Sequence, residues 1–467
     1  MVLLKCNSMD QEPIIVRSLD IKRFNALIGA SRSPALEYYG TELDWLANVE
    51  ETIIGVLIQD LTDRDFVAVA LARDDTRRFR CIDVQSSLAT LDEARNWLVR
   101  AIRWHTVQAV PGDSQPDRAK NLDLFAPVVP LEKQHVYFRD LLRSDALLPA
   151  RSIIAELMPH FVDIDGTFVR EFQTNGFDAR LWELYLNAYF IEEKLFINRK
   201  HTAPDFMIRK YGQAVAIEAA IVGRQSPIRM IQADAAPQFP IVAELLEKNR
   251  NEIPIRFGSA LFTKLQKKYW ELPHVRGMPL VFAIADFHDD CSMTWSSPGL
   301  MRYLYGFEHR FEHDPDGQLV ITPQQITTHK KGSKTIPSGF FFQAEAENVS
   351  AILFSACGTI SKFGRMGRQA GFHHPNMTMQ RIGTCHNHEP NACFPHQYSY
   401  EVNETCRETW AEGLSMFHNP QACAPVPLEL FPSIAHHRLV DGQIVSHVPE
   451  FHPLSSFTIY LAMNKSA

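Results

Sequence analysis

The chain has 467 residues, of which 45% are hydrophobic and 22% charged, and its formal net charge is −7. These proportions are typical of a folded protein of roughly two to four domains, and they exclude a disordered or fibrous chain. The acidic balance also excludes a protein with a wholly basic surface, so any contact with nucleic acid must come from local patches.

Apolar segments along the chain are short, which predicts a soluble protein with no membrane partner. The first residues hold only a four-residue apolar run before Asp10 and Glu12, too short and too acidic for a signal peptide. No window approaches the roughly eighteen uncharged apolar residues of a membrane span. The eight cysteines are scattered, as is typical of reduced thiols. We therefore expect a cytoplasmic location.

Residues 1–110 are predicted to form a small α+β domain. Three strand-like runs separated by short polar turns indicate an antiparallel meander. These runs are residues 52–60, 65–73 and 78–84. A helix over residues 91–104 follows, and Thr90 with Glu93 forms a capping box at its start. No catalytic constellation is found here, so the docking of a protein partner is a hypothesis that rests on position alone.

The next region, residues 111–150, is interpreted as a connector followed by a helix, because prolines lie among polar residues before a helical periodicity. Asp163 and Asp165 resemble the start of a calcium loop, but the later oxygen ligands are missing, so a turn is the preferred interpretation. Residues 151–467 then form the predicted main core, with a His-, Cys- and Pro-rich C-terminal elaboration.

Residues 177–191 have the periodicity of a helix that packs one face on a sheet. Glu183 lies off that face, beside Arg180. Taken alone, this glutamate is best interpreted as a solvent-facing residue that pairs with Arg180, three positions earlier.

Residues 202–208 and 213–222 are predicted to form an antiparallel hairpin. Asp205 directly follows Pro204, near the start of the first strand. Glu218 lies in an otherwise apolar strand, where a carboxylate is costly to bury unless it is paired or binds a cation. Two carboxylates on adjacent strands and a third from the preceding helix would supply oxygen ligands for Mg²⁺.

This order of a helix with Glu183, a Pro-Asp at a strand start and Glu218 in a central strand resembles the PD-(D/E)XK nuclease superfamily, which includes restriction endonucleases. The resemblance implies a mixed-sheet α/β core with helices on both faces, in addition to the N-terminal α+β domain. It also implies a Mg²⁺ or Mn²⁺ site, with ligands from Glu183, Asp205, Glu218 and the carbonyl of Ala219. If one cation is shared, the three carboxylates should lie within about 5 Å of one another.

The activity that the resemblance implies is metal-dependent hydrolysis of phosphodiester bonds in DNA or RNA, as by an endonuclease, with DNA the favoured partner. Asp205 and Glu218 would hold the metal ion, and Glu183 would orient a metal-bound water or a second ion. The context of residues 177–184 is also similar to a group of bacterial proteins, but it brings no assigned activity with it.

One position departs from the motif. Its lysine should stand two residues after Glu218, where this chain has Ala220. Either the amine comes from a later helical stretch, or the site is inactive and the fold serves as a nucleic-acid-binding or assembly module. The candidate amines of that stretch are Lys264, Lys267 and Lys268.

Local basic patches are the predicted contacts with nucleic-acid phosphates. They are represented by Lys268, Lys362, Arg365 and Arg368. A further concentration of charge, residues 329–334, lies in a predicted loop. The alternative for any one patch is a solvated surface without a ligand.

A Cys-x2-His-x4-Cys-x2-His spacing is formed by Cys385, His388, Cys393 and His396. Two such pairs would supply tetrahedral ligands for a structural Zn²⁺. The spacing does not match a common zinc finger, so accidental clustering is the preferred alternative. A zinc-stabilised scaffold is a third interpretation of the whole chain.

Two further buried strands are predicted at residues 279–286 and 349–356. Asp286 and His288 lie at the end of the first. They either line the same cleft as the acidic residues or cap the following turn, and the capping role is preferred.

Overall fold

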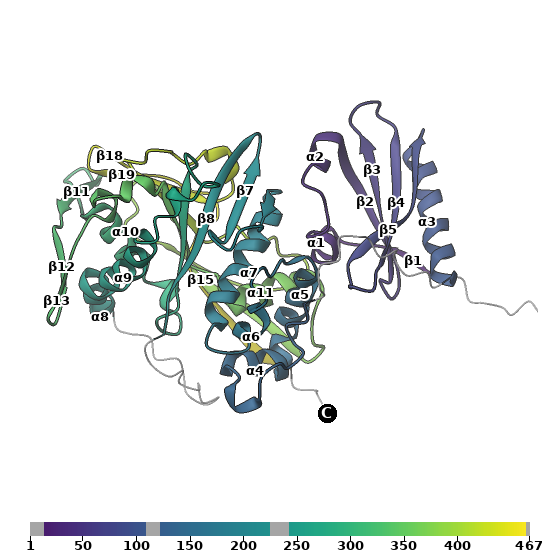
Figure 1. The fold of residues 1–467 in the computed structure, drawn as a ribbon, viewed down its shortest axis with the longest axis horizontal. Coiled ribbons are helices and arrows are strands. Elements are labelled where there is room, and N and C mark those ends of the chain that lie inside the picture. Colours follow the sequence, from purple (N-terminus) through teal and green to yellow (C-terminus); the bar gives the residue numbers. More distant parts are fainter. Residues whose placement is uncertain (1–13, 109–121, 225–241, 464–467) are drawn as a thin grey trace, which may run out of the picture. The chain divides into compact units, whose positions relative to one another are not determined.

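The computed structural model describes residues 14–108, 122–224 and 242–463. The chain divides into two compact units, Met1–Leu122 and Asp123–Ala467 (Figure 1). Each unit has its own sheet and its own buried core. In the described part of the chain, no helix is both long enough and apolar enough to cross a membrane.

The first unit is a five-stranded antiparallel sheet whose strands follow one another in chain order. Its elements are β1 (Val16–Ser18), α1 (Ile21–Ile28), α2 (Leu36–Tyr39), β2 (Gly40–Asn48), β3 (Ile53–Asp60), β4 (Phe66–Arg73), β5 (Phe79–Leu88) and α3 (Leu91–Gln108). The predicted meander and the helix that follows it are confirmed.

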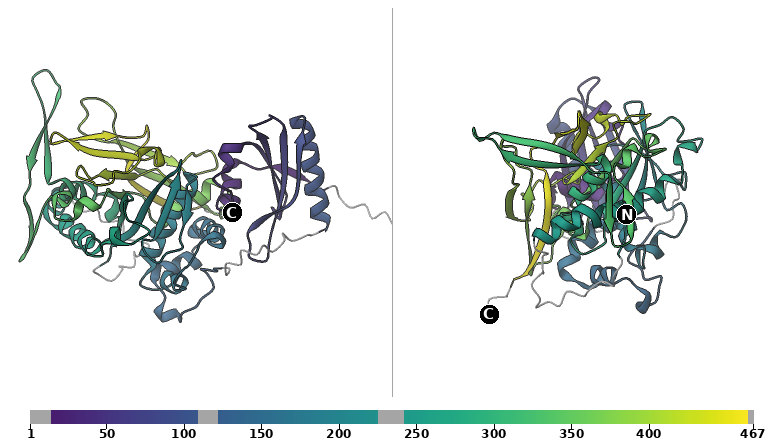
Figure 2. Two further views of the ribbon diagram at one scale, coloured as in Figure 1. Left: turned by 45° about the horizontal axis from the view of Figure 1, so that its top comes forward. Right: turned by 90° about the vertical axis from the view of Figure 1, so that its left-hand side faces the viewer.

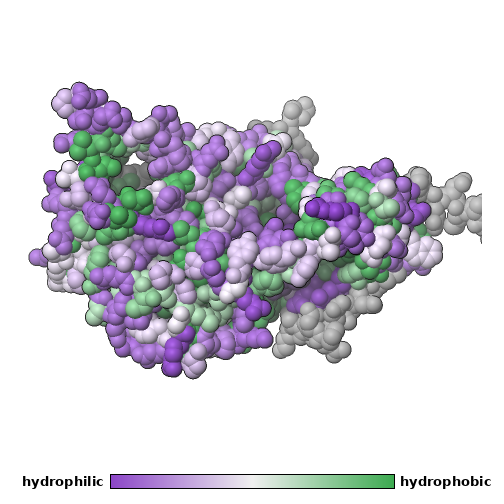
Figure 3. Space-filling view, turned by 90° about the horizontal axis from the view of Figure 1, so that it is seen from above, coloured by the Kyte–Doolittle hydropathy of each residue, from purple (hydrophilic) through white to green (hydrophobic). Residues whose placement is uncertain are grey.

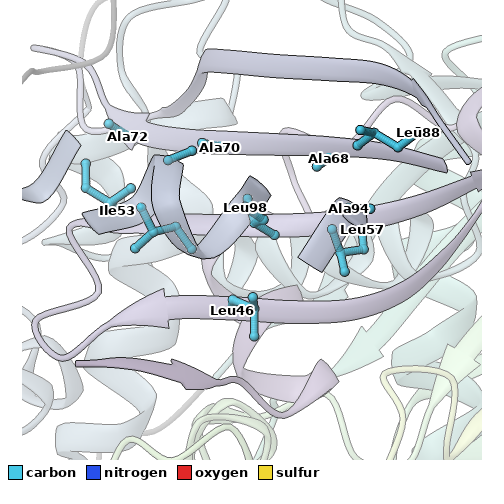
Figure 4. Packing of buried hydrophobic residues seen from close by; sticks show 11 residues of the cluster. Leu46, Ile53, Leu57, Ala68, Ala70, Ala72, Leu88, Ala94 and Leu98 are labelled. Carbon is cyan, nitrogen blue, oxygen red and sulfur yellow. The ribbon is translucent and has the colours of Figure 1, made fainter. Parts of the chain in front are cut away.

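The helix α3 packs on this sheet through the hydrophobic cluster of Figure 4. Leu98 lies at its centre and is fully buried. The close approach requires a glycine on β3, because a Cβ at Gly55 would lie 2.5 Å from Leu98 Cδ1. Burying a leucine side chain stabilises the fold by about 1.5–3 kcal/mol, so burial of Leu98 contributes to the stability of the unit.

The predicted capping box starts α3. The backbone N–H of Glu93 donates to Thr90 Oγ1 at 3.2 Å. The Glu93 carboxylate accepts in return from the N–H of Ala89, at 3.1 Å. The first bond satisfies a backbone donor that the first turn of a helix leaves unpaired, and the second holds the residue that precedes the N-cap.

The second unit is built on an eight-stranded mixed sheet in the order β19-β18-β17-β14-β9-β8-β7-β6. These strands are β6 (Phe196–Asn198), β7 (Phe206–Lys210), β8 (Gln213–Val222), β9 (Leu280–Asp286), β14 (Ala351–Ser355), β17 (Leu414–His418), β18 (Ala435–Val440) and β19 (Gln443–His447). The central strands β8, β9 and β14 are parallel, and β7 pairs with β8 antiparallel as the predicted hairpin. The first strand of the hairpin begins at Phe206 and not at residue 202.

Helices cover both faces of this sheet, as α7 (Phe177–Glu192) and α9 (Ile253–Leu265) demonstrate. Phe354 of β14 contacts Phe257 of α9, whereas the next residue, Ser355, lies 3.5 Å from the Tyr185 hydroxyl of α7. Neighbouring residues of a strand point to opposite faces, so the two helices lie on opposite sides. The predicted mixed α/β architecture is therefore confirmed.

The remaining elements surround this core (Figures 1 and 2). They include α4 (Val136–Arg143), α5 (Leu148–Leu157), α6 (Phe168–Phe172), α8 (Val242–Glu247), α10 (Ser297–Tyr305) and α11 (Ile360–Gln369). Two hairpins pair β10 (Phe307–His313) with β11 (Leu319–Gln325) and β12 (Thr328–Lys331) with β13 (Lys334–Pro337). A three-stranded sheet has the order β16 (His396–Glu401), β15 (Met377–Cys385), β20 (Pro453–Ala462).

The Asp163–Gly166 segment is a turn, as preferred from the sequence. One carboxylate oxygen of Asp163 accepts from the N–H of Gly166 and the other from the N–H of Phe168. Asp163 thus closes a turn before α6.

The face of the molecule shown in Figure 3 is mostly hydrophilic, with small apolar patches.

Candidate functional site

Glu218 is the centre of the candidate site. It lies in the middle of β8 and is only 5% exposed. Its Oε1 accepts from Lys264 Nζ at 2.5 Å and from the Tyr269 hydroxyl at 2.7 Å. Burial, and then the nearby charge of Asp205, raises the pKa of Glu218, while Lys264 opposes this rise. The carboxylate is therefore in a place where an additional positive charge would stabilise its ionised form.

Asp205 lies just before β7 and is partly buried. The β7–β8 ladder ends at the pair Phe206 and Ile217. Beyond it, the Asp205 carboxylate accepts from the backbone N–H of Ala219 at 2.8 Å. The side chain thus continues the hydrogen bonding of the sheet where the strand itself has ended, and this contact positions Asp205 against β8.

Glu183 does not face solvent, although it does pair with Arg180. The residue is 5% exposed, and its two carboxylate oxygens contact Arg180 at 2.5 Å and Arg199 at 2.9 Å. The Arg199 guanidinium lies over the rings of Phe161 and Phe206, 4.2 Å and 4.6 Å from their centroids. Burial, and then the charge of Asp205, raises the pKa of Glu183 to about 7.

The three carboxylates do not form a single compact cation cage. Across residues 14–108, 122–224 and 242–463, the one group of three or more His, Cys, Asp or Glu whose ligand atoms lie within 4.8 Å of one another is Asp60, Asp63 and Asp65. The prediction that Glu183, Asp205 and Glu218 share one ion is therefore wrong. The reason is the layering: Glu183 belongs to the helix on one face of the sheet, and Glu218 points to the helix on the other.

Of the three predicted lysines, Lys264 reaches the site. It projects from α9 and contacts Glu218, as relocation of the motif lysine would require. Lys267 is exposed, and Lys268 pairs with Glu345. Ala220, which occupies the motif position, is a buried residue on the same face of β8 as Glu218.

The basic patch of α11 is not a surface for nucleic acid. Lys362 and Arg365 are buried and both bind Glu408, at 2.7 Å and 2.8 Å, while Arg381 approaches the same carboxylate at 3.3 Å. Arg368, at the end of the helix, pairs with Glu404. The prediction of phosphate contacts at Lys362 and Arg365 is corrected, because α11 turns this basic face into the core.

The other basic patch, residues 329–334, spans the β12–β13 turn, with His329 buried. The ring of His329 contacts the carbonyl of Arg250 and the hydroxyl of Ser338. This histidine therefore anchors the hairpin to the rest of the unit.

The predicted zinc cluster is not assembled. Cys385 and His396 are opposite each other in the β15–β16 ladder, and His388 bonds to the carbonyl of Glu450. In the part of the chain that the structure describes, Cys385, His388, Cys393 and His396 are not among the groups whose ligand atoms lie within 4.8 Å. A tetrahedral zinc ion needs all four ligand atoms close together, so the prediction of a zinc site is corrected for the described residues.

Asp286 has the capping role preferred from the sequence. Its Oδ1 accepts from the backbone N–H of His288 at 3.1 Å and contacts His288 Nδ1 at 2.7 Å. The carboxylate and the imidazole thus close the turn that follows β9.

Several residues of the site carry no recognisable signal in the sequence. Tyr269 and Arg199 become partners of acidic residues only through long-range packing. His201 and His274 stack on each other beside the segment that leads to Asp205, although 73 positions separate them in the chain. The sequence shows His201 next to Lys200, but it does not show that His274 is the stacking partner of His201.

Comparisons with known protein families, with curated proteins and with solved structures give no significant match for this chain.

Proposed function

We propose that the chain is a metal-dependent nuclease whose active site is formed by Asp205, Glu218 and Lys264. The contact between Lys264 and Glu218 carries the proposal, because it returns an amine to a strand that has Ala220 in place of the motif lysine. A restriction-endonuclease-like core belongs to the same proposal. Its support is the order of elements: Glu183 on α7, Asp205 before β7 and Glu218 in the centre of the mixed sheet.

The donor set fits Mg²⁺ or Mn²⁺ with two carboxylates. Within the described contacts, Asp205 uses Oδ2 and Glu218 uses Oε1, so Oδ1 and Oε2 are left for an ion. Mg²⁺ is commonly held by one or two carboxylates, with water and substrate phosphate completing its shell. Both oxygens of Glu183 are engaged by arginines, so Glu183 is assigned to positioning and not to the ion.

A bound ion would polarise a phosphate oxygen and lower the pKa of an attacking water. Lys264 has the complementary role. Its side chain is 27% exposed, and an ammonium has three donors, of which Glu218 takes one. The others are free to bond to a phosphate oxygen as negative charge develops there. Tyr269 holds Glu218 through the same oxygen and so fixes the orientation of the carboxylate.

The test is cleavage of mixed DNA and RNA with Mg²⁺ or Mn²⁺. Asp205→Asn, Glu218→Gln and Lys264→Ala are each expected to lose about a hundredfold or more in rate, as is typical of groups that act on a transition state. Lys267→Ala, an exposed lysine three residues further on, is the matched control and should cleave like wild type. A folded wild-type protein that cleaves nothing with either ion would refute the proposal.

A second candidate is favoured by one observation: each charged group already has a protein partner. Asp205 extends the β7–β8 ladder, and Glu218 pairs with Lys264. The same fold would then be a nucleic-acid-binding module without catalysis. It predicts that Asp205→Asn leaves nucleic-acid binding unchanged and that titration calorimetry detects no binding of Mn²⁺.

A further inference from the structure

A stacked pair of imidazoles lies beside the candidate site. The ring centroids of His201 and His274 are 3.7 Å apart, and the ring planes are 7° from parallel. His274 is anchored by its Nε2, which donates to the carbonyl of Ala203 at 2.8 Å. Ala203 is two residues before Asp205, so the pair is tied to the segment that brings Asp205 to the sheet.

The two rings differ in exposure. His274 is partly buried, whereas His201 is exposed. One face of the His201 ring is covered by His274, so its other face is the one that a ligand can meet. An outer ring that rests on an anchored inner ring is already ordered, which lowers the entropy cost of stacking a ligand against it.

Unpaired positive charges accompany the rings. Lys200 precedes His201, and Arg276 follows His274 by two residues; both are exposed. Within the described residues neither forms an ion pair with a carboxylate, unlike Lys264 and Arg199. In a protein with a net charge of −7, such cations attract phosphates locally and not through the field of the whole molecule.

We propose that His201 and His274 form a stacking platform for an unpaired base, so that the protein takes single-stranded nucleic acid, with Lys200 and Arg276 contacting its backbone. The link to cleavage rests on the proposed function, but the binding does not. Bases within a duplex stack on one another and offer no free face, whereas unpaired bases stack on aromatic side chains, including histidine. Every base has such a face, so the expected selectivity is for strandedness and not for sequence.

The test is fluorescence anisotropy of labelled oligonucleotides of about 12 nucleotides, single-stranded or duplex, in EDTA so that nothing is cleaved. His201→Ala should weaken binding of the single strand about tenfold, within the range for losing one stacked base. His201→Phe, which keeps a flat ring, should retain most of the affinity, whereas His201→Lys, which offers a positive charge without a ring, should not. The duplex should bind more weakly and respond little to these changes.

His313→Ala is the matched control, because His313 is also exposed but lies on β10. Thermal unfolding of each variant shows whether it is folded. The platform is overturned if the wild type does not bind the single strand, or if His201→Ala binds it as tightly as wild type does. If His201→Ala weakens binding but Mg²⁺ supports no cleavage, the platform stands and the nuclease proposal fails.

Discussion

Two Lys–Glu contacts in the second unit place the same chemistry in opposite surroundings. At the candidate site, the Lys264 side chain is 27% exposed where it meets Glu218. In the cluster under α11, Lys362 and Glu408 are 0% and 2% exposed. A ligand can therefore reach Lys264 at the first contact, whereas the second contact is buried among its neighbouring residues.

The balance of charge differs as well. Three cations surround Glu408, and although burial opposes them, they hold the pKa of this carboxyl well below its usual range. Glu218 has one lysine and a second carboxylate, Asp205, and its pKa is raised. The buried cations around Glu408 stabilise one arrangement of the fold. The two carboxylates Glu218 and Asp205 share one partly exposed lysine, and this shortage of positive charge favours the binding of a further cation.

The largest effect is expected from breaking the sealed cluster. Glu408→Ala leaves Lys362 and Arg365 buried without a counter-charge, so the free energy of unfolding should fall by about 3–5 kcal/mol. Denaturation in urea measures this loss. Glu404→Ala removes a half-exposed partner of Arg368 and should cost no more than about 1 kcal/mol. Equal losses in the two variants would contradict the comparison.

Breaking the contact between Lys264 and Glu218 should affect activity more than stability. Lys264→Ala is expected to reduce cleavage about a hundredfold and to lower the free energy of unfolding by less than Lys362→Ala does, because Lys264 is partly exposed and Tyr269 still donates to Glu218. Lys362→Ala should instead lower the free energy of unfolding by several kcal/mol, because it removes buried hydrogen bonds to Glu408 and to the carbonyl of Thr409 and leaves a cavity. Parallel kinetics and urea denaturation measure both quantities, and a Lys264→Ala protein with full activity would rule out the assigned role.

Tyr269→Phe should have a smaller effect. It removes a hydrogen bond to the Glu218 carboxylate but keeps the aromatic ring, which packs against Phe282. Loss of one bond to a charged group costs about 1.5–3 kcal/mol at most, and Lys264 still holds the same oxygen. We expect a rate reduction of about tenfold or less with little change in substrate affinity. A change confined to affinity would assign Tyr269 to binding instead.

The subtlest effect is a difference in pH dependence. The ordinary pKa of a glutamate is 4.5, and that of Glu183 is raised to about 7 in the folded protein. Between these two pH values the folded protein therefore retains a proton that the unfolded chain has released. Its contribution to stability is present below about pH 4.5 and is lost as the pH rises through about 7. Glu183→Gln does not titrate and so does not lose this stability as the pH rises. The melting temperature of the variant minus that of the wild type should therefore increase by roughly a few degrees between pH 5 and pH 8. A constant difference would contradict the raised pKa.

The local pattern predicted much of the fold. Alternating apolar residues predicted the meander of the first unit, and Thr90 with Glu93 predicted the start of α3. The hairpin of residues 202–208 and 213–222 was likewise predicted, and its turn lies between Lys210 and Gln213. These features depend on interactions within a few residues, where periodicity and turn chemistry are decisive.

The candidate site was predictable only in part. The strand positions of Asp205 and Glu218 followed from the hairpin, and Lys264 was among the candidate amines. The burial of Lys362 and Arg365 was not predictable, because a basic helix face has the same sequence pattern whether water or Glu408 covers it. Nor did the sequence reveal that Cys385 and His396 are opposed in an antiparallel ladder, or that the four Cys and His side chains form no compact group within the described residues.

The sequence by itself determined the periodicity, caps and turns of the elements, and with them the face of β8 that carries Glu218. The tertiary structure alone decided which charges meet. Glu183 met Arg199, Lys264 met Glu218 and His201 met His274 because tertiary packing brings helices, loops and strands of the second unit together. Such pairings depend on which surfaces pack together, and no local pattern encodes the partner of a buried or stacked side chain.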